Sequence, residues 1–245
     1  MKKSSEVYDL ILCVFACHTI EKYRHQIQKV KETWASSPPS GVKILFFLGG
    51  EGEKSGHTND DFIYLPGVGN DYMSCSYKQF LGMKYIHDHY TYHYVLSVGT
   101  DTYPVLDKLL NYLKEFDWTR AMYIGGHGCH RRIGEEIPSL YFHSGGPGFI
   151  MTRVAVDKIY DCLDTAVERW TRVCQHHGID LAFACDVAIA YFVYKNGEIE
   201  VIKHPGGGFF YGNHKSASDR NMILSCHNMS LKDFDEFHEY LLRLG

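Results

Sequence analysis

The chain has 245 residues, of which 45% are hydrophobic and 14% aromatic, and this is enough to bury one sizeable core. Its net charge of -4 argues against a nucleic-acid-binding protein, because such proteins usually present a basic face. We therefore expect a single domain over residues 1–245 whose partners are small molecules or glycans, with no nucleic acid among them.

The first part of the chain alternates apolar runs typical of strands with segments of helical periodicity. A breaker at residues 36–41 and a Gly-rich loop at residues 49–60 separate these elements. Such an alternation predicts an α/β fold with a mostly parallel central sheet and helices on both faces. The expected strands lie at residues 8–15, 42–48, 62–65 and 94–98, and the expected helices at 23–34 and 74–89.

The later part of the chain is less regular. Pro104 is expected to open a helix directly after the fourth strand. Arg131 and Arg132 are expected in an exposed Gly/His/Arg loop at the rim of a cleft. Residues 230–233 match a capping box for a final helix. Its apolar face carries Phe234, Phe237 and Leu241, and other elements are expected at 121–124, 141–142, 153–163 and 186–194.

The sequence shows no membrane or export signal. No apolar stretch approaches the roughly 18 residues that a membrane span needs, and residues 1–5 lack the apolar core of a signal peptide. The sequence as written predicts a cytoplasmic protein without a membrane span, such as a viral one. If the chain is the trimmed portion of a longer anchored protein, a lumenal location is expected instead.

The eight cysteines show no paired Cys-x-x-Cys spacing, so they indicate neither a zinc site nor a disulfide framework. Reduced thiols in the core are the simplest interpretation. His127, Cys129 and His130 form a local cluster that could suggest zinc. No second pair of ligands accompanies the cluster at a suitable spacing, and zinc usually takes four ligands.

Asp101 follows the apolar run of the fourth expected strand, with Thr102 and Tyr103 directly after it. A carboxylate at the end of a buried strand can hold a divalent cation against a diphosphate, because hard cations prefer oxygen ligands. The alternative is that Asp101 only caps a following helix.

Several short motifs carry a family resemblance through their order and spacing. They are Arg24…Thr33-Trp34, Tyr77-Lys78, Asp101-Thr102-Tyr103, Ser144-Gly145-Gly146-Pro147-Gly148-Phe149, Asp186-Val187 and Cys226-His227. Together they resemble the Fringe, core 1 β3-galactosyltransferase and β3-N-acetylglucosaminyltransferase family over nearly the whole chain. The resemblance implies a GT-A fold, Rossmann-like in its sheet, and an inverting enzyme that moves a sugar from a UDP-sugar to a hydroxyl of a glycan or glycoprotein with Mn²⁺ as cofactor. The donor-binding part would span about residues 6–103, and the acceptor-binding and catalytic part about residues 104–245.

The family's metal motif is a run of three aspartates, which this chain replaces with Gly99, Thr100 and Asp101. The third aspartate is the one that meets the metal in the family, so the resemblance implies that Asp101 is a metal ligand. Thr100 would then lie at the donor. The loss of the first two acids removes contacts to the ribose and around the metal, and could weaken metal affinity.

His227 precedes the expected last helix, as the metal-binding histidine does in the family, so the resemblance makes it the second expected ligand. An imidazole is a suitable ligand for manganese beside carboxylate and phosphate oxygens. His204 and His214 are the competing candidates, and each of these histidines could also be an ordinary surface or capping residue.

An inverting transfer needs a carboxylate that deprotonates the acceptor hydroxyl. The family has an acidic pair before a helix, and this chain keeps the second acid as Asp186 while Cys185 replaces the first. The resemblance therefore implies that Asp186 is the catalytic base. The alternative is that Asp186 is the N-cap of a helix, and the two roles are compatible. His143 and Asp180 are the next candidates for the base.

The segment Ser144, Gly145, Gly146 resembles the family's Gly-rich turn, where the missing side chains let the backbone approach the donor or acceptor. Arg24 and Lys78 match basic positions that approach the nucleotide, although both could be solvated helix charges. Because acids are missing beside Asp101 and Asp186, two alternatives stay open. One is an inactive family member that binds nucleotide or glycan, and the other is a metal-independent glycosyltransferase.

Overall fold

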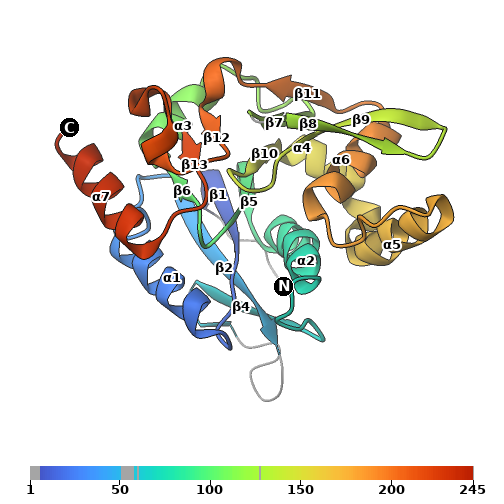
Figure 1. Cartoon of the computed structure of the whole chain (residues 1–245), viewed down its shortest axis with the longest axis horizontal. Coiled ribbons are helices and arrows are strands. Elements are labelled where there is room, and N and C mark those ends of the chain that lie inside the picture. The colour runs from blue at the N-terminus through green and yellow to red at the C-terminus, as the bar shows by residue number, and fades with distance from the viewer. Residues whose placement is uncertain (1–5, 51–57, 60, 127, 245) are drawn as a thin grey trace.

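The computed structural model describes residues 6–50, 58–59, 61–126 and 128–244, and a central β-sheet organises them (Figure 1). Over these residues the sheet has eight strands in the order β11-β7-β10-β5-β1-β2-β4-β3. The strands are β1 (Val7–Phe15), β2 (Val42–Gly50), β3 (Thr58–Asn59), β4 (Phe62–Pro66), β5 (Thr91–Gly99), β7 (Met122–Gly125), β10 (Phe149–Thr152) and β11 (Glu200–Lys203).

The pairing of these strands confirms the mostly parallel sheet. Strand β1 runs parallel to β2 and β5, β2 runs parallel to β4, and β7 runs parallel to β11. Strand β10 is antiparallel to both of its neighbours, β5 and β7, and β3 is antiparallel to β4 at the edge. A parallel sheet covered on both faces requires strands that are apolar throughout, and residues 10–14 of β1 are accordingly 0% exposed.

Helices cover both faces of the sheet, as expected from the sequence (Figure 1). Alternate residues of β1 point to opposite faces, so Ile11 and Cys13 join one apolar cluster while Leu12 and Val14 join the other. One face packs against α1 (Glu21–Glu32), α3 (Leu106–Leu113) and α7 (Leu231–Leu242). The other packs against α2 (Ser74–His89), α4 (Arg153–Ile159), α5 (Ala166–His177) and α6 (Cys185–Asn196). None of the helices within the described residues has the length and apolarity that crossing a membrane requires.

Two smaller sheets complete the described part of the chain. A hairpin joins β8 (Gly128–Ile133) to β9 (Ile137–His143). A three-stranded sheet orders β12 (Phe209–Phe210), β13 (Ser225–Cys226) and β6 (Tyr103–Pro104). In this sheet Cys226 lies opposite Tyr103, so the segment after β13 runs beside the segment before β6.

Three local expectations are corrected by the structure. Pro104 does not open a helix: it pairs with Ser225 in the small sheet, and α3 starts at Leu106. Arg131 and Arg132 lie in β8 and not in a loop, because the exposed hairpin tolerates charged side chains. The helix expected near residues 153–163 is α-helical only to Ile159 and continues as the 3₁₀ segment η2 (Tyr160–Thr165).

Candidate active site

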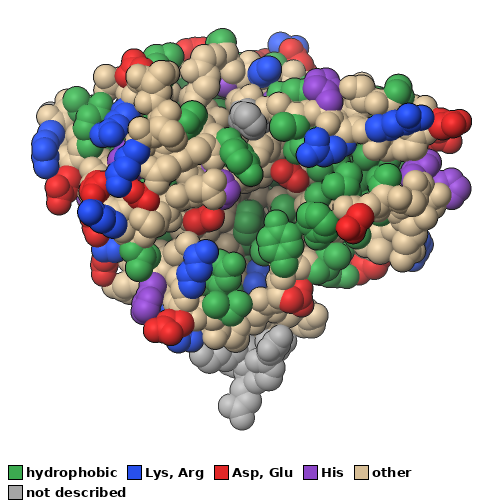
Figure 2. All heavy atoms as spheres, viewed as in Figure 1, with side chains coloured by type: hydrophobic (Ala, Val, Ile, Leu, Met, Phe, Trp, Pro, Cys, Tyr) green, Lys and Arg blue, Asp and Glu red, His purple; other side chains and the backbone are tan. Residues whose placement is uncertain are grey.

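Strands β1 and β5 end side by side, and the loops after them border a cavity of about 820 Å³. In open α/β sheets ligands bind beyond the carboxyl ends of the strands, and the volume suits a small-molecule site. Figure 2 shows a hollow near the middle of this face, with hydrophobic and acidic side chains around it. Eight of the nine expected site residues line the cavity: Lys78, Thr100, Asp101, Ser144, Gly145, Gly146, Asp186 and His227.

Asp101 and His227 meet at the cavity wall because the small sheet brings their segments together. Asp101 Oδ2 lies 3.3 Å from His227 Nε2. The backbone is tied as well, since the Met229 N–H donates to the Asp101 carbonyl over 3.0 Å. The other ring nitrogen of His227, Nδ1, is buried and has no hydrogen-bond partner among the described residues. The pair is therefore held by the fold and is not a chance contact of two mobile side chains.

The electrostatic setting keeps Asp101 ionised. Burial alone would raise the pKa of its carboxyl, but the hydrogen bond and positive charge of His227 act against this, and Lys22 adds a smaller effect. The resulting pKa lies below the ordinary value for an aspartate. Asp101 is thus available as an anionic ligand near neutral pH.

The spacing of this pair fits a divalent ion. Two neighbouring ligand atoms at bond lengths of about 2.1 Å in an octahedral site stand about 3 Å apart. The 3.3 Å between Asp101 Oδ2 and His227 Nε2 is close to that value. A carboxylate and an imidazole are a ligand set that manganese and other first-row divalent ions accept. Asp101 and His227 are therefore the residues that could hold a metal in this cavity.

Gly146 makes the position of His227 possible. A Cβ atom at Gly146 would lie only 2.5 Å from Nδ1 of His227, so a larger residue would collide with the ring. The Gly146 carbonyl accepts a hydrogen bond from the buried Thr102 hydroxyl over 2.7 Å, and Ser225 makes an equally short bond to the Pro147 carbonyl. Hydrogen bonds to the carbonyls of Gly146 and Pro147 thus fix the Gly-rich turn next to the ring of His227.

Asp186 lies in the first turn of α6 and holds the same Gly-rich turn from the other side. Its Oδ2 accepts from the Gly145 N–H and its Oδ1 accepts from the Val187 N–H, both over 2.9 Å. Ala184 is the N-cap of α6, so Asp186 is not the capping residue itself. Each carboxylate oxygen has a second lone pair, and the side chain faces the cavity. The arrangement leaves Asp186 able to accept a proton from a bound hydroxyl.

The remaining polar positions differ in how they are held. Lys78 is 2% exposed, and its ammonium donates to the Ala16 carbonyl over 2.9 Å and to Asn70 Oδ1 over 3.0 Å. The Thr100 hydroxyl donates to Gln26 Oε1 over 2.8 Å. Lys78 therefore gives the cavity wall a fixed positive charge, while Thr100 is used to join β5 to α1.

Arg24 is the expected site residue that the structure does not bring to the cavity. It lies on α1, and its guanidinium donates to the carbonyls of His18 and Thr19 over 3.0 and 3.4 Å. Arg24 is among the residues that the structure describes, and it does not line the cavity. Its contacts tie the loop after β1 to α1, so the structure gives it a role in holding that loop.

The competing histidines lie elsewhere. His204 packs against Tyr112, and its Nδ1 accepts from the Gly208 N–H. His214 lies beneath α7, and His143 is buried in the core, where burial lowers its pKa to about 4. None of these three histidines lines the cavity, and Asp180 does not line it either.

The local His/Cys cluster does not form a unit in the described structure. His127 lies outside the described residues. Cys129 lines the cavity, whereas His130 on the neighbouring position of β8 bonds the hydroxyl of Ser139 over 2.8 Å. Successive residues of a strand point to opposite sides, so β8 separates the two side chains. All eight cysteines are free thiols.

Aromatic residues that the sequence reasoning missed stand at the mouth of the cavity. Tyr72 is 70% exposed and Phe183 40% exposed, and their ring centroids lie 5.9 Å apart. Tyr211, 48% exposed, lies 5.5 Å from the ring of His227. The signal for Tyr72 was its place in a polar Gly/Asn/Asp segment, where a large aromatic residue has no core to fill.

Comparison with known proteins places most of the chain in one family. Residues 7–206 match the model of the Fringe-like family. The chain is 32% identical over 146 residues to chondroitin sulfate synthase 3 of Homo sapiens, covering 54% of this chain and 16% of that protein. The mouse protein of the same name is 34% identical over 112 residues, covering 41% and 12% respectively. The chain thus spans less than a fifth of the length of these curated relatives.

Solved structures share the fold at low sequence identity. The glycosyltransferase GlyE of Streptococcus pneumoniae TIGR4 matches in its apo form with a TM-score of 0.54 and 12% identity, over 98% of this chain and 64% of GlyE. A glycosyltransferase involved in the glycosylation of the major capsid of PBCV-1 matches with a TM-score of 0.50 and 12% identity, over 94% and 99%. The expected GT-A-like α/β fold is confirmed by these likenesses.

Proposed function

Because the chain belongs to the Fringe-like family of glycosyltransferases, we propose that it transfers a sugar from a UDP-sugar to a hydroxyl of a glycan or glycoprotein, with inversion and with a divalent metal. The observation that carries this proposal is that Asp101, His227 and Asp186 line one cavity at the carboxyl end of the sheet. The first two suit the donor side of the reaction, and Asp186 suits the acceptor side.

On the donor side, Asp101 and His227 would hold the metal, for which Mn²⁺ is our first candidate. A divalent ion bound there would neutralise charge on the departing diphosphate. Lys78 presents a second positive charge from the buried wall of the cavity, fixed by two hydrogen bonds. The Gly-rich turn leaves backbone exposed between these charges and Asp186, which suits close contact with the sugar.

On the acceptor side, Asp186 would act as the base. In a single displacement the acceptor oxygen forms the new bond to the sugar, the bond from the sugar to the diphosphate breaks, and the acceptor proton passes to the carboxylate. Hydrogen bonds from the N–H groups of Gly145 and Val187 fix the carboxylate in one orientation. Such orientation is a large part of what a general base contributes.

One observation favours the metal-independent alternative as the second candidate. Lys22 acts on the pKa of Asp101 and, with it, lines a smaller neighbouring cavity. A side chain at Gly99 would also be tightly packed, because its Cβ would lie 3.1 Å from Asp101 Oδ1 and 3.3 Å from the ring of Phe15, so these neighbours would have to shift by a few tenths of an ångström. If the shortened acidic motif binds no metal, Lys22 could supply the positive charge that the metal would otherwise provide.

Thermal melting with ligand separates the two candidates. We expect UDP with Mn²⁺ to raise the melting temperature more than UDP or Mn²⁺ alone, since a ligand that binds only the folded state stabilises it. Asp101→Asn should remove the part of the shift that needs Mn²⁺. Equal shifts with Mn²⁺ and with a chelator would overturn the metal assignment and support the metal-independent enzyme. A hydrolysis screen over UDP- and GDP-sugars would identify the donor.

The base is tested by Asp186→Asn, with Asp180→Asn as the matched control outside the cavity. Asp186→Asn should keep UDP-sugar binding while the transfer rate falls by roughly 10²-fold or more, the usual effect of losing a general base. Asp180→Asn should change neither. Unchanged transfer in Asp186→Asn would require another base. A wild-type protein that binds UDP but transfers no sugar from any donor would support the inactive binding protein.

A further inference from the structure

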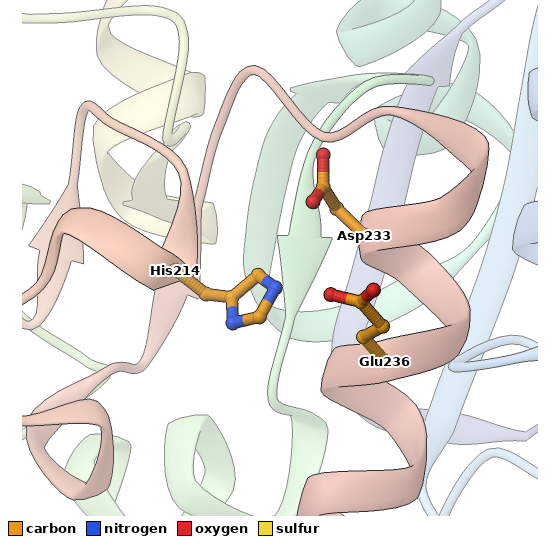
Figure 3. Close-up of side chains that lie close together, drawn as sticks. All are labelled: His214, Asp233 and Glu236. Carbon is orange, nitrogen blue, oxygen red and sulfur yellow. The ribbon is translucent and has the colours of Figure 1, made fainter.

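A second cluster of possible metal ligands lies away from the cavity, beneath helix α7. His214 belongs to the 3₁₀ segment η4 (His214–Ser216), while Asp233 and Glu236 lie one turn apart on α7. One ligand atom from each of the three side chains lies within 4.8 Å of the other two. Figure 3 shows the imidazole facing both carboxylates across the gap between η4 and α7.

His214 gives the independent sign that something is missing from this cluster. The residue is only 1% exposed, and neither of its ring nitrogens has a hydrogen-bond partner among the described residues. Buried polar atoms without a partner are costly and uncommon in folded proteins. The ring is also fixed, because it stacks on Phe237 with centroids 4.8 Å apart and planes 26° apart. The imidazole of His214 is thus rigid, buried and unpaired, and it faces two carboxylates. These properties suit it to be a metal ligand.

Lys215 now occupies the space between the carboxylates. Its ammonium lies 2.7 Å from Asp233 Oδ1 and 2.7 Å from Glu236 Oε2. The Lys215 side chain is 46% exposed, so it can move into solvent without unfolding anything around it. The ammonium of Lys215 pairs with the two carboxylates, but the imidazole of His214 stays without a hydrogen-bond partner among the described residues. A divalent ion would satisfy all three groups at once.

We propose that His214, Asp233 and Glu236 form a structural site for a divalent transition metal such as zinc, which displaces the Lys215 ammonium when it binds. One imidazole and two carboxylates are ligands that zinc accepts, and water would complete four-coordination. With bonds of 2.0–2.2 Å at tetrahedral angles, two ligand atoms of one ion stand about 3.3–3.6 Å apart. The ligand atoms now lie within 4.8 Å of one another, so the side chains must close by roughly 1 Å when the ion binds.

The site would support the candidate active site from a distance. It would link η4 to α7, and the chain between β12 and β13 that carries η4 also leads to His227. The His227 N–H donates to the Gly212 carbonyl over 3.3 Å, two residues before His214. The Asn213 amide donates to the Asn228 carbonyl over 3.3 Å. A metal bound by His214, Asp233 and Glu236 would thus hold in place the segment after β13 that presents His227 to Asp101.

Zinc binding can be measured separately from any metal at the cavity. The protein carries Asp101→Asn to disable the cavity ligand, is stripped with a chelator, and is titrated with zinc alone in a calorimeter. We expect His214→Phe to bind one zinc equivalent fewer than its parent, because phenylalanine keeps the stack on Phe237 but has no ligand atom. At a hundredfold excess over Kd, zinc should raise the melting temperature of the parent by roughly 5–10 °C, and this rise should be lost in His214→Phe.

Two lysine variants sharpen the test. Lys215→Met removes the internal cation, so it should tighten zinc binding by roughly tenfold or more, as the metal no longer competes with an ammonium. Lys232→Met is the matched control, because Lys232 also contacts Glu236, over 3.4 Å, but is 80% exposed and does not bridge the acids. Equal zinc stoichiometry in His214→Phe and its parent would overturn the proposal, as would equal affinities in the two lysine variants. If His214→Phe does not fold, Glu236→Gln replaces it with the same expected loss.

Discussion

A single methyl group at Gly146 should disable the Asp101 and His227 pair without changing either residue. The added Cβ of Gly146→Ala would stand 2.5 Å from His227 Nδ1 and 2.8 Å from its Cγ, where unstrained contacts between such atoms are about 3.5 Å. The imidazole must therefore retreat by about 1 Å. The backbone itself accepts alanine, since Gly146 is not among the described glycines with a left-handed φ. A shift of 1 Å exceeds the few tenths of an ångström that metal coordination tolerates.

The size of the effect follows from overpacking. Extra atoms in a packed site typically cost about 1–3 kcal/mol, so Gly146→Ala should lower the free energy of unfolding by about that amount. In a His227→Ala background the imidazole is absent, so the added Cβ has no ring to clash with. There the same substitution should be neutral or stabilising by up to about 1 kcal/mol, because alanine reduces the entropy of the unfolded chain. The two sites should therefore show a coupling energy of at least about 1 kcal/mol.

The assay is urea denaturation of the wild type, both single variants and the double variant, with the Mn²⁺-dependent melting shift in UDP measured on Gly146→Ala. We expect that shift to be lost or strongly reduced. An identical cost of Gly146→Ala in both backgrounds would show that the methyl group does not meet the His227 ring. A full Mn²⁺-dependent shift in Gly146→Ala would refute the role of the ring as a metal ligand.

Three further predictions concern residues in and around the cavity. Ser225→Ala should cost about 1–2 kcal/mol of unfolding free energy by urea denaturation, because it leaves the buried Pro147 carbonyl without its 2.7 Å partner; a change below about 0.3 kcal/mol would contradict this. Because folding lowers the pKa of Asp101, its stabilisation should be complete above the unfolded value of about 3.9 and be lost as the pH falls through the folded value. The stability gap between wild type and Asp101→Asn should accordingly shrink below about pH 4, and a gap that does not vary with pH would count against the pairing. Tyr72→Ala and Phe183→Ala should raise the KM for a glycan acceptor several-fold while UDP binding stays the same, since exposed aromatic rings at the mouth suit sugar faces; unchanged kinetics would assign the pair to folding alone.

Features that depend on a few neighbouring residues could be predicted from the sequence. The capping box of α7 is confirmed, because Ser230 and Asp233 exchange their two hydrogen bonds within one turn. The alternation of strands and helices gave the fold class for the same reason. The structure also brings eight of the nine expected site residues together in one cavity.

Features that depend on distant partners could not be predicted. Arg24 looked like a nucleotide contact, yet an exposed arginine on a helix has no local feature that distinguishes a ligand contact from its bonds to the His18 and Thr19 carbonyls. The charged strand β8 resembled a loop, since only its pairing with β9 makes it extended. Helix α5 was not expected, although Val167, Trp170 and Cys174 are buried at helical spacing.

The Gly-rich turn explains why the expected base and the expected metal pair are found together despite the loss of three acids, at Gly99, Thr100 and Cys185. Gly145 donates its N–H to Asp186, and the next residue, Gly146, leaves the space that His227 fills. The two halves of the site are thus positioned by consecutive residues of one turn, and Thr102 fixes the Gly146 carbonyl. The distance between Asp186 and the Asp101–His227 pair therefore depends on the backbone of this turn and hardly on the lost side chains. Preorganisation of this kind survives the replacement of the acids by Gly99, Thr100 and Cys185, which favours the proposed working enzyme over an inactive relative.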